Sequence, residues 1–264
     1  MGIHLSEASG STIAELAWFC VPPERRGDPV FRRGAHAKEA WIQERLARGE
    51  PVAKVAYVEG EAAGILHYEP VPEEGAVHIL CLYVPHERHW GKGIGSSLLA
   101  TLVEEMRSPQ AWNGGQPARG IATRTFAGHH PGQLPAREFF RRRGFEPVGE
   151  DPDFLFLPLQ MGARHEPRRS PLAYVPQAED TDQVIILHGP SFCPWTYPFL
   201  VLAAQAIAEI APHLPIRWID RVSTPHEAAA RGGYEGVVVN GRPIRSFVLD
   251  REEFEGEVRC ALRG

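Results

Sequence analysis

A glycine-rich stretch at residues 84–95 holds the residue types and spacing best suited to binding a charged ligand. Arg88, Gly91 and Gly93 fit the pattern Arg/Gln-x-x-Gly-x-Gly, and Gly95 extends it. An apolar run typical of a strand precedes the pattern, and a run with helical spacing follows it. Backbone N–H groups converge where a strand, a tight turn and a helix meet, and the helix dipole adds positive potential there. Because glycine permits the required dihedrals and lets phosphates approach the amides, the stretch suits a pyrophosphate.

Two other phosphate-binding loops do not fit these residues. A Walker loop requires Gly-Lys-Ser/Thr at the helix start, whereas Lys92 is followed by Gly93. A dinucleotide fingerprint requires Gly-x-Gly-x-x-Gly, whereas Gly91, Gly93 and Gly95 are spaced two apart. The spacing resembles the coenzyme A pyrophosphate loop of the GNAT superfamily of N-acetyltransferases. An ordinary glycine-rich turn between a strand and a helix is the alternative that the loop alone leaves open.

Composition points to a globular chain in a reducing compartment. The 264 residues are 43% hydrophobic, which is enough to bury one large core or two smaller ones. No apolar run approaches the roughly 18 residues of a membrane span, and the polar start lacks the apolar segment of a secretory signal. The net charge of −5 argues against a general nucleic-acid binder. We therefore expect a cytoplasmic protein without nucleic-acid or membrane partners.

The spacing of cysteine and histidine predicts no metal site. The four cysteines lie far apart without metal-type pairs, so reduced thiols are expected, and the 12 histidines form no ligand set. Three consecutive arginines, residues 141–143, are explained as cations that end a helix. The four cysteines are Cys20, Cys81, Cys193 and Cys260.

The chain divides into two parts whose hydrophobic patterns differ. Residues 161–182 are rich in proline and charge and show no periodicity, which is typical of a linker. We therefore predict a first domain at residues 1–160, a linker at 161–182 and a second, smaller domain at 183–264. No internal repeat is visible.

The first domain is predicted to be α/β, of the α+β kind. Its order of helix, hairpin, strand, glycine loop, helix, strand, helix and strand resembles the GNAT acyltransferase fold. Residues 136–145 also resemble that superfamily's Ala-x-x-Phe-Tyr-x-x-x-Gly-Phe segment. The expected helices are 35–48, 96–106 and 135–143, and the expected strands are 52–58, 62–69, 78–84, 121–126 and 154–159.

The second domain is predicted to have the order βαβαββα, which resembles the thioredoxin fold. The whole chain resembles GNAT proteins that carry a C-terminal YoaP-type, thioredoxin-like domain. The features that carry this likeness are Phe19-Cys20, Lys38 with Trp41, Cys81-Leu82, and Cys193-Pro194. The expected strands are 184–188, 216–222, 236–240 and 242–249, and the expected helices are 197–211, 224–231 and 251–262.

The GNAT resemblance implies that acetyl-CoA is the acyl donor. Backbone groups near residues 82–84 would then hold the pantetheine arm, and one of their amides would polarise the thioester carbonyl. The superfamily often supplies a tyrosine as the acid, but Phe140 stands at that position, so another group must protonate the leaving thiolate or it leaves unassisted. Gln133 stands where an asparagine often contacts the pantetheine. The expected contact residues are Leu82, Tyr83, Val84, Arg88, His89, Trp90, Gly91, Lys92, Gly93, Ile94, Gly95, Ser96, Gln133 and Phe140.

Three residues are candidates for the base that takes the proton of the acceptor amine. Glu69, His78 and Cys81, with His67 beside them, lie by resemblance on or next to strands that border the acceptor cleft. Strand alternation predicts that His78 and Cys81 face opposite sides of the sheet. A plain surface histidine at His78 and a small core residue at Cys81 are the alternatives.

Cys193 is the candidate for a reactive thiol. It opens a helix, where N–H groups and the helix dipole should lower the pKa of a thiol, although a thiol that packs quietly beneath the loop is the alternative. Thr196 stands where a dithiol enzyme has its resolving cysteine, so a self-contained Cys-x-x-Cys exchange is excluded. Glu235 is expected near the thiol, where its charge would oppose a thiolate. A single-thiol domain could instead bind or present a thiol-bearing or metal-bearing ligand.

Together these patterns favour an acetyl-CoA-dependent N-acetyltransferase that acts on a small-molecule or peptide amine. The monothiol, thioredoxin-like domain would influence the choice of acceptor, and a homodimer is one possible assembly. Two alternatives stay open. One is a thiol-redox or metal-handling protein whose GNAT half senses coenzyme A, and the other is a non-catalytic acyl-CoA-binding scaffold, which Phe140 suggests.

Overall fold

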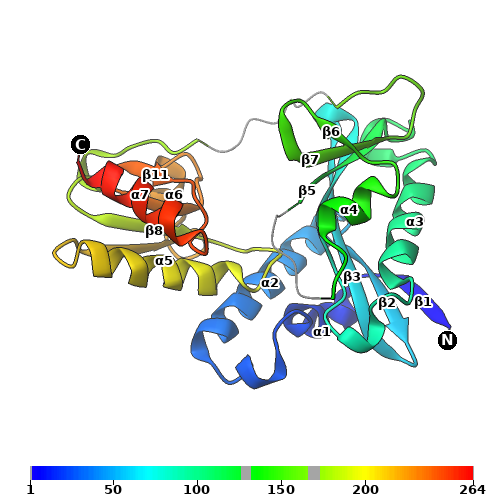
Figure 1. Cartoon of the computed structure of the whole chain (residues 1–264), viewed down its shortest axis with the longest axis horizontal. Helices are drawn as coiled ribbons and strands as arrows, with labels where there is room; N and C mark the ends of the chain where they lie inside the picture. The colour runs from blue at the N-terminus through cyan, green and yellow to red at the C-terminus, as the bar shows by residue number, and fades with distance from the viewer. Residues whose placement is uncertain (1, 126–131, 166–172, 264) are drawn as a thin grey trace. The chain divides into compact units, whose positions relative to one another are not determined.

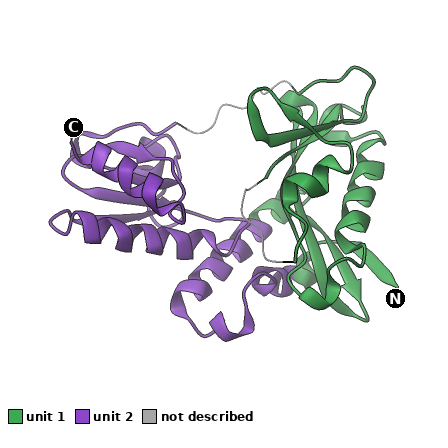
Figure 2. Cartoon of the chain, viewed as in Figure 1, with its two compact units in different colours: residues 1–12, 44–169 green, residues 13–43, 170–264 purple. Residues whose placement is uncertain are grey.

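The chain forms two compact units (Figures 1 and 2). The structure is a computed structural model and describes residues 2–125, 132–165 and 173–263. Unit 1 contains Met1–Thr12 and Glu44–Arg169, and unit 2 contains Ile13–Gln43 and Ser170–Gly264. Residues 13–43 therefore cluster with the C-terminal segment, whereas the sequence pattern suggested a single boundary at the linker. None of the helices in the described part of the chain combines the length and apolar character that crossing a membrane requires.

Unit 1 is built on a seven-stranded sheet with the order β1-β2-β3-β4-β5-β7-β6. All neighbouring strands are antiparallel except β4 and β5, which are parallel. A parallel pair requires a crossover connection, and α3 lies in that connection. The elements are β1 (Ile3–Glu7), β2 (Ala53–Val58), β3 (Glu61–Val71), β4 (Ala76–Tyr83), α3 (Ile94–Met106), β5 (Gly120–Arg124), α4 (Ala136–Arg141), β6 (Glu146–Val148) and β7 (Asp151–Pro158).

The helices α3 and α4 pack against this sheet and complete the core of unit 1. Leu98 of α3 is fully buried and belongs to the same apolar cluster as Ile121 of β5 and Phe140 of α4. The close approach of α3 to β3 depends on Gly64, because a Cβ there would lie 2.6 Å from Cγ2 of Ile94. The core therefore fixes the position of the first turn of α3.

A bulge in β4 changes which side chains share a face of the sheet. His78 lies opposite Glu69 and Cys81 lies opposite His67, and the register shifts between these two pairs. Glu69 and His67 are two residues apart on β3, so their side chains share a face. His78 and Cys81 therefore lie on one face, and the prediction that strand alternation separates them is wrong. The residue that a bulge inserts reverses the alternation beyond it.

Unit 2 contains a four-stranded sheet with the order β11-β10-β8-β9. β8 pairs parallel with β9 and antiparallel with β10, and β8 is buried along its whole length, as expected for a central strand. The predicted order βαβαββα is observed. The elements are β8 (Val184–His188), α5 (Thr196–Ile210), β9 (Ile216–Asp220), α6 (Pro225–Ala230), β10 (Gly236–Val239), β11 (Arg242–Ile244) and α7 (Arg251–Leu262), preceded in the sequence by α1 (Ile13–Trp18) and α2 (Pro29–Ala47).

The helix α2 begins at Pro29 rather than at residue 35. The Val30 N–H donates to Oδ1 of Asp28 at 2.8 Å, and proline occupies the first helical position, so the helix start is well capped. Gly34 does not interrupt the helix. A Cβ at Gly34 would lie 2.0 Å from the carbonyl oxygen of Pro194, so glycine permits close packing inside unit 2.

Other predicted boundaries differ from the structure near the ends of elements. β11 ends at Ile244 rather than at residue 249, and β1, α1 and β6 were not predicted. β5 ends at Arg124, and residue 126, the last of the predicted strand, lies outside the described residues. Residues 166–172 of the predicted linker also lie outside them.

Candidate functional site

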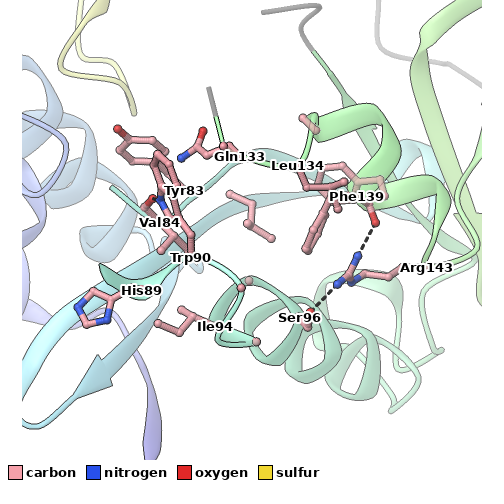
Figure 3. A pocket seen from close by; sticks show the side chains of 17 residues that line it. Tyr83, Val84, His89, Trp90, Ile94, Ser96, Gln133, Leu134, Phe139 and Arg143 are labelled. Atoms are coloured by element: carbon pink, nitrogen blue, oxygen red, sulfur yellow. Dashed lines mark hydrogen bonds between the residues drawn. The ribbon is translucent and has the colours of Figure 1, made fainter. Parts of the chain in front are cut away.

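A cavity of about 440 Å³ lies in unit 1 where β4 ends and α3 begins. Its walls come from three segments: the end of β4 with the glycine loop, the first turn of α3, and the segment around α4 (Figure 3). All residues expected to contact coenzyme A line the cavity except Arg88 and Lys92. The lining residues are Leu82, Tyr83, Val84, His89, Trp90, Gly91, Gly93, Ile94, Gly95, Ser96, Gly132, Gln133, Leu134, Ala136, Phe139, Phe140 and Arg143.

The glycine loop enters α3 through two left-handed backbone conformations. Gly91 has a φ of 70° and Gly93 a φ of 82°, which other residues rarely adopt. A Cβ at either position would meet no atom within 4 Å, so the outer side of the loop is open. Gly93 occupies the N-cap position of α3, and no side chain caps the helix. The first N–H groups of α3 therefore have no partner within the helix, and the residues that carry them line the cavity.

The loop is held in place by its own side chain and backbone bonds. The indole Nε1 of Trp90 donates to the carbonyl oxygen of Val84 at 2.9 Å. The Ser97 N–H donates to the carbonyl oxygen of Gly93 at 2.9 Å and so starts the helical hydrogen bonding. These bonds hold the loop in shape without using the amides at the start of α3.

The strands β4 and β5 part beside the cavity. Their parallel pairing runs from Ala76 with Gly120 to Ile79 with Thr123 and stops there. β4 continues to Tyr83, and on its other edge it still pairs with β3. Its edge beyond Ile79 therefore has backbone groups that β5 does not pair, next to the cavity wall.

Arg143 lines the cavity from the end of α4, and the sequence interpretation missed it. Its guanidinium donates to Oγ of Ser96 at 2.5 Å and to the carbonyl oxygen of Phe139 at 2.7 Å. The charged group lies 3.7 Å from the centre of the Phe139 ring, a cation–π distance (Figure 3). Burial and the neighbouring Arg142 lower the pKa of Arg143. The three arginines at 141–143 could have indicated an anion-binding side chain, but their spacing did not show which of them faces the cavity.

Phe140 and Gln133 line the cavity on the α4 side. Phe140 is 5% exposed, and its ring meets those of Phe139 and Phe145 edge to face, with centroids 5.2 and 5.0 Å apart. It is therefore a core side chain whose surface reaches the cavity and has no proton to give. Gln133 lines the cavity from the segment before α4 (Figure 3).

The basic residues of the glycine loop differ in their surroundings. Arg88 donates to Oε2 of Glu61 at 2.7 Å, and neither it nor Lys92 lines the cavity. His89 lines the cavity and is 7% exposed. Burial, reinforced by the charges of Arg88 and Lys92, lowers the pKa of His89. A neutral imidazole is therefore favoured at His89.

The acceptor-side candidates lie on β3 and β4 and do not line this cavity. Glu69 is held by Arg45, whose Nη1 lies 3.2 Å from its Oε2. His67 is 1% exposed, and its Nδ1 lies 3.1 Å from the carbonyl oxygen of Val52. Cys81 is partly exposed. None of these side chains lines the cavity, and Glu69 is already engaged in an ion pair.

His78 belongs to a cluster that spacing did not predict. Its Nε2 lies 2.7 Å from Oε2 of Glu74, and Nε2 of His165 lies 3.1 Å from the same oxygen. The side chains of Glu74 and His165 are 2% and 1% exposed. Spacing along the chain did not predict that two histidines converge on one carboxylate, with all three possible ligand atoms within 4.8 Å of one another.

Cys193 lies in unit 2, just before α5. Burial raises the pKa of its thiol and outweighs the backbone N–H groups of Trp195 and Thr196, which act to lower it. The helix start acts to lower the pKa of this thiol, as expected, but burial has the larger effect. Glu235 pairs with Arg221 at 3.3 Å and is not among the groups that shift the pKa of Cys193.

Comparison with known proteins adds a family match to this geometry. The model of the acetyltransferase (GNAT) family matches residues 11–145. Similar solved structures include a GNAT acetyltransferase from Staphylococcus aureus Mu50, at 16% identity and a TM-score of 0.45, covering 60% of this chain and 100% of that one. A GNAT acetyltransferase from Desulfovibrio desulfuricans is 21% identical, with a TM-score of 0.44 and the same coverage.

A third structure is a GNAT acetyltransferase from Brucella melitensis in complex with acetyl-CoA. It is 16% identical with a TM-score of 0.40, and the match covers 64% of this chain and 94% of that one. A search of curated proteins gave no match.

Proposed function

The chain belongs to the GNAT family of acetyltransferases, and we propose that it transfers the acetyl group of acetyl-CoA to the amine of a small molecule or peptide. The observation that supports this proposal most directly is the cavity at the start of α3. It combines an uncapped helix start, two left-handed glycines and an inward-turned arginine within one unit.

The cavity fits the charged end of coenzyme A. The amides of Ile94, Gly95 and Ser96 would bind the pyrophosphate, because a helix start favours anions. Gly91 and Gly93 leave room for it, since a Cβ at either would project into open space. Arg143 would add a positive charge from the opposite wall.

The acyl end would lie along β4. Coenzyme A supplies an activated thioester, and the chain's part is to orient it. Beyond Ile79, where β5 no longer pairs with β4, backbone groups of β4 would meet the pantetheine arm, and an amide near residues 82–84 would polarise the thioester carbonyl. The apolar side chains of Leu82 and Phe139 exclude water beside it.

Proton transfer is the step for which the side chains give least support. Phe140 cannot protonate the leaving thiolate, so that thiolate leaves unassisted or takes its proton from water. Glu69 and His78 are our candidates for the base, together with Cys81. Glu69 would act as the base while its carboxylate is paired with Arg45. His78 would act while its Nε2 is hydrogen-bonded to the carboxylate of Glu74.

We also propose that unit 2 provides a thioredoxin-like accessory part. The order βαβαββα, a parallel β8–β9 pair and an antiparallel β10–β11 pair support this assignment. Unit 2 would influence which acceptor is used, and Cys193 would be the residue that contacts a ligand.

Calorimetry with acetyl-CoA tests the transferase proposal. The native protein should bind acetyl-CoA, and Gly93→Trp should weaken binding at least about 100-fold, because the indole would occupy the space of the pyrophosphate. Gly49→Trp is a matched control, since Gly49 also has a positive φ (69°) and no atom within 4 Å of its Cβ position, yet does not line the cavity. Absence of binding by the native protein would reject the proposal.

An assay of coenzyme A release with a panel of amines then separates an enzyme from a scaffold. Turnover on at least one amine supports the transferase. Tight binding of acetyl-CoA without turnover on any amine favours the non-catalytic scaffold, which the absence of an acid at Phe140 suggests.

A further inference from the structure

Lys38 is buried in the part of α2 that belongs to unit 2, and its ammonium has an unusual partner. Lys38 is 0% exposed, and its Nζ lies 3.8 Å from Sγ of Cys20. Within the described residues, this thiol is the only group that hydrogen-bonds to the ammonium. A buried ammonium costs several kcal/mol unless an anion compensates its charge. The site therefore favours a ligand set that carries negative charge.

Hydrogen bonds on both sides of Cys193 hold it near Cys20 and Lys38. Two residues before it, the Ser191 N–H donates at 3.1 Å to the carbonyl oxygen of Ala37, the residue that precedes the buried lysine. Two residues after it, Nε1 of Trp195 donates at 2.9 Å to the carbonyl oxygen of Cys20. Cys193 therefore lies between two residues, Ser191 and Trp195, that are hydrogen-bonded to the segments carrying Lys38 and Cys20. Three segments far apart in sequence meet here.

Aromatic side chains on both sides of Cys193 in the chain pack against aromatic residues of α2. The Trp195 ring meets Phe31 edge to face with centroids 4.8 Å apart, and Trp41 meets Phe192 at 6.2 Å. These ring contacts join the chain on both sides of Cys193 to α2, the helix that carries Lys38. Both cysteines keep partial solvent exposure, so a small ion can reach them.

We propose that Cys20 and Cys193 bind one Cu(I) ion through two thiolates, with Lys38 neutralising the complex. Thiolates are soft ligands that select Cu(I). One Cu(I) with two thiolates carries a net charge of −1, which matches the single ammonium of Lys38. The spacing of the cysteines along the chain gave no hint of this site, because the fold brings them together.

The same charge count disfavours the competing occupants. Two thiolates and a Zn²⁺ ion are neutral and need two further ligands. The one group of three potential ligands found among the described residues, Glu74 with His78 and His165, lies in unit 1. A disulfide between Cys20 and Cys193 would consume both thiols and leave the buried Lys38 without an anion.

Binding must release protons from the site. Burial raises the pKa of Cys20 and of Cys193, whereas the charge of Lys38 acts to lower both. Cu(I) binds the thiolate form of cysteine, so each thiol gives its proton to the buffer when copper binds.

The test uses the reduced full-length protein under anaerobic conditions, with Cu(I) supplied by a chromophoric chelator. The native protein should remove one Cu(I) per chain, and X-ray absorption should show two sulfur ligands. Cys20→Ser and Cys193→Ser should each weaken binding at least about 100-fold. Cys81→Ser and Cys260→Ser are the matched controls and should bind as the native protein does.

Lys38→Met tests the charge argument separately. It should fold, as judged by circular dichroism, and bind Cu(I) about tenfold more weakly or worse. Unchanged binding in Cys20→Ser or in Lys38→Met would overturn the proposal. Formation of a Cys20–Cys193 disulfide by a small disulfide such as cystamine, without Cu(I) binding, would replace it with a dithiol redox site. Gly93→Trp should bind Cu(I) normally, so failure of the transferase proposal and failure of the copper site are distinguishable.

Discussion

Arg143 joins the two walls of the cavity, because it extends from the end of α4 to Ser96 at the start of α3. We predict that Arg143→Gln raises KM for acetyl-CoA about tenfold, which corresponds to about 1.4 kcal/mol of lost binding. The effect on kcat should be small, since the charge would contact the pyrophosphate and not the reacting carbon. Steady-state kinetics with varied acetyl-CoA measures this split.

Arg142→Gln is the control for this substitution. Arg142 is exposed, pairs with Glu138 of α4 and does not line the cavity, so its loss should leave both constants unchanged. A fall in kcat without a change in KM for Arg143→Gln would contradict an anchoring role. An equal effect of both variants would point to a general loss of positive charge instead of a specific contact.

Residue types in the loop predicted much of the cavity wall, but not the whole of it. Gly91, Gly93 and Gly95 are adjacent in sequence, and a strand–turn–helix junction is a local feature, so spacing was sufficient to find them. Arg143 reaches the cavity only because α4 packs where it does. The meeting of Cys20 with Cys193 likewise depends on packing between distant segments, which periodicity does not report.

At the scale of elements, strands and helices with strong periodicity were predicted closely, while irregular features were not. The predicted strand at residues 184–188 and helix at 251–262 match β8 and α7. The bulge in β4 was missed, because its extra residue leaves the apolar pattern nearly intact while it reverses the faces. That single insertion places His78 and Cys81 on the same face.

The predicted linker illustrates a second limit at this scale. Its last part contains a short 3₁₀ turn, Ala178–Asp180, tied to the end of α6 by a buried ion pair. Both carboxylate oxygens of Asp180 lie 3.1 Å from Nε of Arg231, and the two side chains are 0% and 2% exposed. The pair is a long-range contact between two segments that look polar in sequence. It makes this part of the predicted linker a packed piece of unit 2.

We predict that Arg231→Met destabilises the protein by about 3–5 kcal/mol, because it leaves the Asp180 carboxylate buried without its partner. Burial opposes ionisation of Asp180, but the hydrogen bonds from Arg231 and Tyr174 outweigh it, and the pKa of Asp180 is lowered. Urea denaturation at pH 7 measures the change in the free energy of unfolding.

The double variant Asp180→Asn with Arg231→Met provides the control for this pair. Removing the charge as well as its partner should recover part of the loss, so the double variant should be more stable than Arg231→Met alone. If the losses of stability measured for Asp180→Asn and for Arg231→Met alone simply add in the double variant, the ion pair is not the source of the destabilisation.

At the scale of the whole molecule, the sequence pattern and the compact units divide the chain differently. Residues 13–43 precede the hairpin of unit 1 in sequence but cluster with unit 2, and the family match at residues 11–145 includes them. Composition identifies a polar linker, but it does not show whether a helical segment such as residues 13–43 packs into the core of unit 1 or of unit 2. The proposed copper site depends on this arrangement, since Cys20 and Lys38 come from that segment.

The stability of unit 2 should depend on pH through His188, the last residue of β8. The side chain is 8% exposed, and burial lowers its pKa, with Arg33 acting in the same direction and Asp220 against it. The unfolded chain, with a histidine pKa of about 6.5, therefore binds a proton more readily than the folded chain does. Stability from this group is complete above about pH 6.5 and is lost as the pH falls through the lower, folded-state pKa.

His188→Phe removes the titrating group while an aromatic ring still faces Tyr197 and Trp218, whose centroids lie 5.3 and 5.9 Å away in the native protein. We predict that the variant loses less stability than the native protein between pH 7.5 and pH 5, as measured by urea denaturation at each pH. His213→Phe is the control, because His213 is exposed and its removal should leave the native pH dependence intact. If His188→Phe keeps the full native pH dependence, the acid sensitivity of unit 2 comes from another group, and the buried neutral imidazole is not what limits its stability in acid.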